Sequence, residues 1–280
     1  MHILLRSLLA AVLVSSVHAQ RDGKLFLVPV LVNGRGPYWF CVDSGAPHSV
    51  IDPTIVKDLG LKSIGSTTIK GTGEGSVPVV RTEALTMAIG RAKVNVAEPW
   101  VIDLSEVPIP KFVHGLVGAE WFEAYAMEMS SERSTLRFFD ASTFRTPRGA
   151  TTIPLEDTDH RLFMNVTIDV TKDETVTRRV RIDTGSSDSV GDEIAKHART
   201  TQTTTLGNGL GTNYQSVSGL MDGVHIGPFT FRNVWGPATH SSNIGMEMLR
   251  RFTVTFDVPH RAMHLRPNRF FAEPVPPPEE

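Results

Sequence analysis

The stretch Phe40-Cys41-Val42-Asp43-Ser44-Gly45-Ala46 returns in the second half of the chain as Val180-Arg181-Ile182-Asp183-Thr184-Gly185-Ser186. In both copies an apolar, strand-like run ends at an aspartate that is followed by a hydroxyl residue and a glycine. The two aspartates are 140 residues apart, a separation typical of one small domain. The sequence therefore predicts two lobes that each supply one carboxylate to a shared site.

Other features recur in the same order. Lys24–Val32 and Arg161–Ile168 both place a basic residue before a strand-like apolar run that leads to the aspartate strand. Downstream, Leu116-Val117-Gly118 is matched by Asn243-Ile244-Gly245. One Asp-Ser/Thr-Gly tripeptide is weak support for a site, because its residues are common in β-turns. The repeated order of features indicates a duplicated unit.

The remaining sequence predicts an all-β protein. Short alternating segments are separated by glycine, proline and threonine turns. Two short helices are expected just after the aspartate motifs, at Pro53–Leu59 with Asp52 as its cap and at Asp192–Arg199. We place the N-terminal lobe at residues 20–147, the C-terminal lobe at 148–271 and an extended, solvated, proline-rich tail at 272–280.

The first nineteen residues are typical of a signal peptide. Arg6 precedes the apolar run Leu8–Val14, and Val17-His18-Ala19 has small residues at the positions that a signal peptidase inspects. A membrane anchor is the alternative, but the run is roughly half of the about 20 residues needed to span a bilayer. We therefore expect cleavage after Ala19, a secreted or periplasmic protein, and no stable membrane insertion afterwards.

The charge and cysteine content of the chain exclude some kinds of partner and of cross-link. The 280 residues carry a formal net charge of -2, without a long basic run, so nucleic acid is not an expected partner. Cys41 is the one cysteine and has no partner for an intramolecular disulfide; we expect it to pack as a small apolar residue.

The two Asp-Ser/Thr-Gly motifs, together with Leu116-Val117-Gly118 and Ile244-Gly245, resemble the pepsin-like and retropepsin-like aspartic proteases. This resemblance implies a two-lobed acid-protease fold in which each lobe is a small retropepsin-like β-barrel and the cleft lies between the lobes. It implies that Asp43 and Asp183 are the catalytic pair. It also implies supporting roles for Ser44, Gly45, Thr184 and Gly185, and loops that cross behind the aspartates at Gly118 and Gly245.

Such enzymes cover the cleft with a hairpin flap. The candidate is Gly71-Thr72-Gly73-Glu74-Gly75, and the matching place in the second lobe is 207–212. Neither loop has the glycine spacing of a phosphate-binding loop or a helix after it. The first loop has no tyrosine such as pepsin-like flaps carry, which favours a retropepsin-style flap. No pro-segment is evident before Lys24.

Histidine-based sites are the weaker alternatives. His48 follows Asp43 by five residues, but no Gly-x-Ser-x-Gly motif supports a serine triad. His260 and His264 have a spacing that binds zinc on a helix, but here a strand or turn is expected. We predict no metal and no cofactor.

The leading hypothesis is an aspartic endopeptidase, active as a monomer on a peptide or protein substrate. The alternative is a non-catalytic two-lobed relative that binds a protein or carbohydrate. A third possibility is that one lobe is the dimer interface of a larger assembly.

Overall fold

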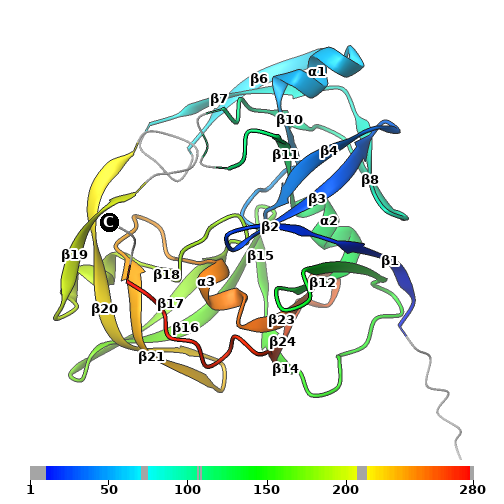
Figure 1. The fold of residues 1–280 in the computed structure, drawn as a ribbon. Helices are drawn as coiled ribbons and strands as arrows, with labels where there is room; N and C mark the ends of the chain where they lie inside the picture. The colour runs from blue at the N-terminus through cyan, green and yellow to red at the C-terminus, as the bar shows by residue number, and fades with distance from the viewer. Residues whose placement is uncertain (1–10, 71–74, 106, 108, 207–212, 278–280) are drawn as a thin grey trace, which may run out of the picture.

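The computed structural model describes residues 11–70, 75–105, 107, 109–206 and 213–277. In this part of the chain, strands form three sheets, one in each lobe and one between them. Figure 1 shows the first lobe around β3, β4, β6 and β7, the second lobe around β16, β17, β20 and β21, and β12, β23, β24 and β14 along the base that joins them.

The sheet of the first lobe has the strand order β6-β7-β10-β5-β11-β4-β3-β8-β9, and β2 pairs with β3. Its elements are β2 (Gln20–Asp22), β3 (Leu25–Val32), β4 (Arg35–Val42), β5 (Val50–Ile51), α1 (Pro53–Leu59), β6 (Ser63–Ile69), β7 (Val77–Thr82), β8 (Leu85–Ile89), β9 (Ala92–Val96), β10 (Trp100–Val101), β11 (Val113–Val117) and α2 (Ala119–Ala124).

The sheet of the second lobe has the order β18-β22-β17-β16-β20-β19, with β15 on β16 and β21 on β20. Its elements are β15 (Glu156–Thr158), β16 (Arg161–Thr171), β17 (Glu174–Ile182), β18 (Val190–Gly191), the 3-10 helix η1 (Glu193–His197), β19 (Thr201–Leu206), β20 (Tyr214–Ile226), β21 (Phe229–Pro237), β22 (Asn243–Ile244) and α3 (Met246–Leu249).

The sheet between the lobes has the order β1-β13-β12-β23-β24-β14. Its elements are β1 (Leu13–His18), β12 (Tyr125–Ser130), β13 (Thr135–Asp140), β14 (Thr151–Pro154), β23 (Phe252–Asp257), the 3-10 helix η2 (Val258–His260) and β24 (Ala262–Pro267). β12 and β23 meet at its centre, where Met127 is paired with Phe256. Both central strands are almost wholly buried; one continuous apolar core extends from the first lobe through this sheet into the second.

The two short helices lie where the sequence predicts them, with one change of type. Asp52 caps α1 by accepting hydrogen bonds from the Thr54 and Ile55 N–H groups, and the helix ends at Gly60 with φ 64°. In the second lobe Asp192 caps a 3-10 helix of five residues instead of the α-helix expected over 192–199. Helices as short as this one often take the tighter 3-10 form.

The N-terminal segment gives a result that its sequence pattern did not predict. Residues 13–18, inside the predicted signal peptide, form β1 at the edge of the sheet between the lobes, paired with β13. Ala19 is only 1% exposed. Cleavage after Ala19 would therefore remove a strand from this sheet. Among the residues described, no helix is both long and apolar enough to cross a membrane.

The described part of the proline-rich tail, residues 272–277, is not fully solvated, which differs from the expectation for these residues. Val275 is buried, and the Pro274 carbonyl accepts a hydrogen bond of 3.1 Å from Arg251. The start of the tail packs on the second lobe because Arg251, itself 0% exposed, needs acceptors for its buried donors.

Candidate active site

Each aspartate follows a strand whose end is fixed by a neighbouring parallel strand. The Asp43 N–H donates to Val117 O at 3.0 Å, and the Asp183 N–H donates to Ile244 O at 2.9 Å. The acceptors are at the ends of β11 and β22, which run parallel to β4 and β17. The same backbone contact therefore holds both aspartates.

The hydroxyl residues Ser44 and Thr184 join the two lobes reciprocally. Ser44 Oγ donates to Ile182 O at 2.8 Å and accepts the Thr184 N–H at 3.0 Å. Thr184 Oγ1 donates to Val42 O at 2.9 Å and accepts the Ser44 N–H at 2.9 Å. Ser44 and Thr184 are 2% and 1% exposed. These bonds satisfy backbone groups that water does not reach, and they bring the two aspartate turns together.

The glycine of each motif lies against the carboxylate of the other lobe. A Cβ atom at Gly45 would be 2.7 Å from Asp183 Cγ, and one at Gly185 would be 2.5 Å from Asp43 Cγ. Both distances are shorter than real Cβ contacts. A larger residue at either position would displace a carboxylate, so this close approach requires glycine. The structure thus brings Asp43 and Asp183 into one site, here called the dyad.

Hydrogen bonding and burial set the electrostatics of the dyad. Asp43 Oδ1 accepts the Gly45 N–H at 2.8 Å, and Asp183 Oδ1 accepts the Gly185 N–H at 3.1 Å. Burial, followed by the negative charge of Asp183, raises the pKa of Asp43 to about 7; the Gly45 N–H and Arg181 lower it, and a hydrogen bond with Asp183 raises it again. Two such carboxyls can share one proton over a wide pH range.

Residues 28–121, which include Asp43 and Gly118, match the family model described as aspartyl protease. This match covers about a third of the chain, so its first lobe resembles the aspartyl proteases. Its fold is similar to that in the crystal structure of basic 7S globulin from soybean, with a TM-score of 0.52 and 13% identity over 92% of this chain and 95% of that one. This likeness confirms the predicted two-lobed, all-β acid-protease fold. A search of the curated proteins found no match.

The two crossing loops are close-packed at their glycines. A Cβ at Gly118 would be 2.4 Å from the His48 carbonyl carbon, and one at Gly245 would be 2.6 Å from Asp188 O. In each lobe, the loop after the aspartate therefore packs directly on the crossing loop. Asn243, which departs from the apolar pattern of the first lobe, is 6% exposed.

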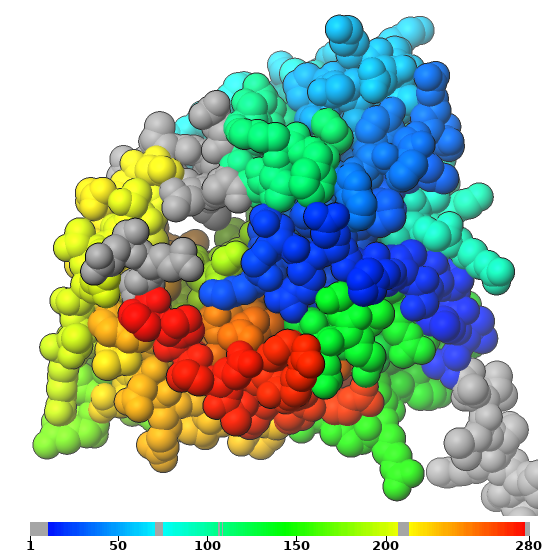
Figure 2. Space-filling view, viewed as in Figure 1, coloured from blue at the N-terminus to red at the C-terminus, as the bar shows by residue number. Residues whose placement is uncertain are grey.

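The predicted flap is described only at its base. Ile69 pairs with Val77, so β6 and β7 form an antiparallel hairpin, and Gly75 has φ 86°; Gly71, Thr72, Gly73 and Glu74 are outside the described residues. In the second lobe, β19 and β20 form a matching hairpin, and residues 207–212 are likewise outside the description. Figure 2 shows a hollow in the surface between the first lobe and the yellow hairpin of the second.

Sequence reasoning did not assign a role to Arg181. Its Nη2 atom is 2.9 Å from Asp183 Oδ2, and the pair is largely buried, with side-chain exposures of 20% and 8%. The first-lobe residue at the same position is Cys41, which is buried; burial, followed by the charges of Asp43 and Asp183, raises its thiol pKa well above the usual range. Alternation along a strand could have revealed Arg181, because a residue two before the aspartate faces the same side.

The histidines singled out in the sequence are paired with acidic residues other than Asp43 and Asp183. His48 Nδ1 is 3.6 Å from Glu120 Oε1, and its ring packs on Trp100 at 4.6 Å between centroids. His260 and His264 both face Asp257, at 2.7 and 3.5 Å. Within the part of the chain that the structure describes, no group of three or more histidine, cysteine or acidic residues could hold a metal ion.

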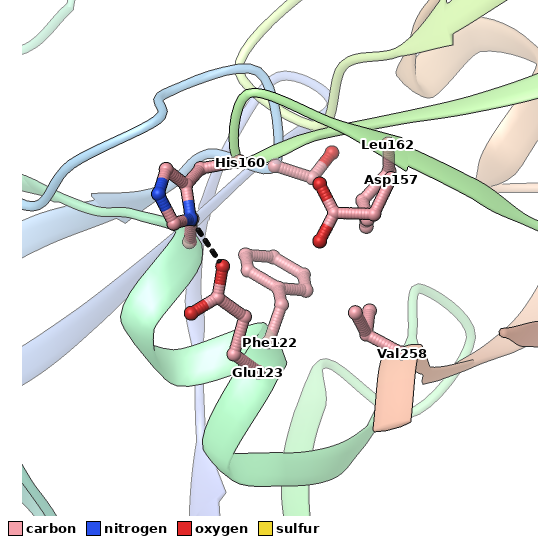
Figure 3. Close-up of a pocket in the computed structure, with 8 residues that line it drawn as sticks. Phe122, Glu123, Asp157, His160, Leu162 and Val258 are labelled. Atoms are coloured by element: carbon pink, nitrogen blue, oxygen red, sulfur yellow. Dashed lines mark hydrogen bonds and ion pairs between the residues drawn. The ribbon is translucent and has the colours of Figure 1, made fainter. Parts of the chain in front are cut away.

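A small pocket lies at the junction of the lobes, and Figure 3 shows its lining. Phe122 and Glu123 come from α2 of the first lobe, and Asp157 and Leu162 from the second. His160 Nδ1 is 2.6 Å from Glu123 Oε1 across the junction. Ser44 also borders this pocket. The His160–Glu123 pair and the hydrogen bonds of the Ser44 and Thr184 hydroxyls therefore join the two lobes at neighbouring points.

Proposed function

We propose that the chain is an aspartic endopeptidase in which Asp43 and Asp183 activate a water molecule for peptide-bond hydrolysis. The observation that carries the proposal is the reciprocal arrangement of the dyad, in which each lobe's glycine packs on the other lobe's carboxylate. The match of residues 28–121 to the aspartyl protease family model supports the same class of reaction.

The reaction needs one proton on the dyad. The ionised carboxylate accepts a proton from water while the water oxygen bonds to the carbonyl carbon, and the protonated carboxyl gives its proton to the carbonyl oxygen. The tetrahedral diol then collapses: the C–N bond breaks, the leaving nitrogen takes a proton from the protonated carboxyl, and the ionised carboxylate takes the proton of one diol hydroxyl as the carbonyl re-forms. The rise of the Asp43 pKa to about 7 favours this singly protonated form from acidic to near-neutral pH, so we expect activity to fall above about pH 7.

The substrate in this proposal is an extended peptide bound between the lobes. The β6–β7 hairpin of the first lobe and the β19–β20 hairpin of the second supply strands for such a peptide. A peptide chain in extended conformation can satisfy its backbone groups by pairing with such strands.

One observation favours a second candidate, a non-catalytic two-lobed relative that binds a protein or carbohydrate. Arg181 forms an ion pair with Asp183, and a cation paired with a reactive carboxylate makes it a weaker base. The endopeptidase is the better-supported proposal because both aspartates of the site are present and the hydroxyl residues beside them hydrogen bond across the lobes.

The test is cleavage of a peptide library between pH 3 and 8 by the wild type and by the Asp43→Asn and Asp183→Asn variants. Asparagine keeps the size of the side chain and an acceptor for the glycine N–H, so each variant should fold. We expect the wild type to cleave, each variant to lose about 10²–10⁴-fold in rate, and a statine-type transition-state mimic to inhibit the wild type.

Two outcomes would overturn the proposal. A wild type that binds but cleaves nothing over the whole pH range supports the binding protein. A variant that keeps full activity would show that the paired-carboxylate mechanism is wrong.

We also propose that the protein is exported, secreted or periplasmic, and that it works as a monomer. The apolar N-terminal segment is the support for export, and the presence of both aspartates in one chain is the support for a monomer. Fractionation of cells and light scattering of the purified chain test these two points.

A further inference from the structure

The dyad is symmetric in its backbone but not in its charges. Two residues before Asp183, β17 carries Arg181; two residues before Asp43, β4 carries the buried, uncharged Cys41. Side chains two apart on a strand share a face. Among the described residues, a cation therefore hydrogen bonds directly to only one of the two carboxyls, that of Asp183.

The two carboxyls also differ in the number of N–H donors that they accept. Asp183 accepts N–H donors on both oxygens, from Gly185 on Oδ1 at 3.1 Å and from Arg181 on Oδ2 at 2.9 Å. In the described part of the chain, the N–H donor to the Asp43 carboxyl is Gly45, on Oδ1. A carboxyl whose two oxygens both accept is stabilised as the carboxylate, whereas Asp43 keeps one oxygen on which a proton can reside.

The other charged groups near the dyad make no hydrogen bond to either carboxyl among the described residues. Burial, followed by the charge of the nearby Arg181, lowers the pKa of Arg161, which is at the start of β16. Asp188 lies beyond Asp183; burial raises its pKa, and the charge of Asp183 adds to this rise, while Lys24 opposes it. Lys24 is paired with Glu247 at 2.7 Å. On the first-lobe side, Cys41 is near Asp22. Arg181 is the cation with a direct hydrogen bond to a dyad carboxylate.

We propose that Arg181 is a positioning residue that makes Asp183 the ionised member of the dyad and leaves the shared proton on Asp43. This inference rests on the proposed function. In the hydrolytic step Asp183 then accepts the proton of the attacking water, and Asp43 gives its proton to the carbonyl oxygen, so that charge and protons balance. Among the described residues, the Arg181 guanidinium donates to Asp183 through Nη2 at 2.9 Å, whereas its Nε atom is buried without a hydrogen-bond partner.

The direction of the pH effect follows from the charge. A cation stabilises every ionised state of the dyad, and Arg181 accordingly lowers the pKa of Asp43. Its removal raises both apparent pKa values of the pair. Both limbs of the pH profile of kcat/KM should move to higher pH, by about one unit.

The experiment compares Arg181→Gln and Arg181→Lys with a matched control. Arg179→Gln removes the same charge from the same face of β17, about 7 Å farther along the strand, where Arg179 is paired with Glu156 at 2.6 Å and half-exposed. We expect a shift of both limbs for Arg181→Gln, a smaller shift for Arg181→Lys and none for Arg179→Gln. Arg181→Met, which keeps an apolar stem, replaces the glutamine variant if that does not fold.

A second readout needs no catalysis. The protein is labelled with ¹³C at the aspartate carboxyls. The resonances of Asp43 and Asp183 are assigned by their loss in Asp43→Asn and Asp183→Asn, and NMR then follows them as the pH changes. Arg181→Gln should raise the titration of Asp43, whose pKa the charge of Arg181 lowers. An unchanged titration and pH profile in this variant would overturn the inference while leaving an active wild type as a protease; an inactive wild type whose titrations do shift would overturn the proposed function alone.

Discussion

The turns after β4 and β17 have the same backbone contacts and different surroundings. Both aspartates donate their N–H to a crossing strand, and both hydroxyl residues bond across the lobes. The side chains behind these turns differ: Cys41 is an apolar neighbour of one aspartate and Arg181 an ionic neighbour of the other. The backbone symmetry builds the site, and the side-chain asymmetry can assign different roles to its two acids.

The same contrast recurs at the crossing loops. Two residues after each crossing glycine stands a glutamate, Glu120 or Glu247. Glu120 accepts hydrogen bonds from Ser49, with Oε2 2.7 Å from Ser49 Oγ. Glu247 is 2% exposed and is paired with three cations: Lys24 at 2.7 Å, Arg250 at 2.9 Å and Arg251 at 2.5 Å.

The largest effect on stability is expected at Glu247. Glu247→Gln leaves the fully buried Arg251 without a counter-charge, which costs about 3–5 kcal/mol of unfolding free energy. Glu120→Gln, the matched control, keeps an acceptor for Ser49 and should cost about 1 kcal/mol. Urea unfolding of both variants measures the difference. Equal losses of unfolding free energy would mean that the ion pairs of Glu247 stabilise the fold no more than the hydrogen bonds of Glu120 do.

The next effect is a gain in stability on removing the Asp43 charge. Asp43 titrates near 3.9 when unfolded and near 7 when folded, so between these values the folded chain binds more protons. Stability therefore falls as pH rises through this window, and the cost is complete above about pH 7. Asp43→Asn should raise the unfolding free energy by roughly 2–4 kcal/mol at pH 8 and by little at pH 3.

Urea unfolding at pH 3, 5 and 8 checks this, with the exposed Asp173→Asn as the control. A gain that is the same at every pH would show that the benefit of asparagine does not come from the titration of Asp43.

The sequence predicted the features that repeat and missed those that do not. The aspartate turns, α1 with its Asp52 cap and the crossing glycines follow from local patterns that occur in each half. Arg181 has no counterpart in the first half, so repetition gave no hint of its ion pair. The strand β1 was hidden for another reason, because the apolar composition of an edge strand and that of a signal peptide are alike over six residues.

The sheet between the lobes nevertheless gives β1 a counterpart. In the order β1-β13-β12-β23-β24-β14, β1 and β14 occupy the two equivalent edges. Val14 and Val17 pack against the core, and Ser15 Oγ donates to Ile89 O at 3.1 Å. A chain that begins at Gln20 should therefore be less stable than one that begins at Ala11, by about 2 kcal/mol.

Thermal unfolding of the two chains measures this. Equal stability would show that β1 contributes nothing to the fold, unlike its counterpart, and would strengthen the prediction of cleavage after Ala19.

The smallest effect tests the symmetry of the two hydroxyls. Ser44→Ala and Thr184→Ala each remove one buried donor and one buried acceptor that serve the backbone of the other lobe, at about 1–2 kcal/mol each. Thr184→Ser, which keeps the hydroxyl and removes only the methyl group, separates packing from hydrogen bonding. If the junction is symmetric, Ser44→Ala should lower the unfolding free energy as much as Thr184→Ala does once the cost of Thr184→Ser has been subtracted. Urea unfolding measures both costs. A much larger loss of unfolding free energy in one of the two variants would mean that the hydroxyl of that lobe contributes most of the stability of the junction.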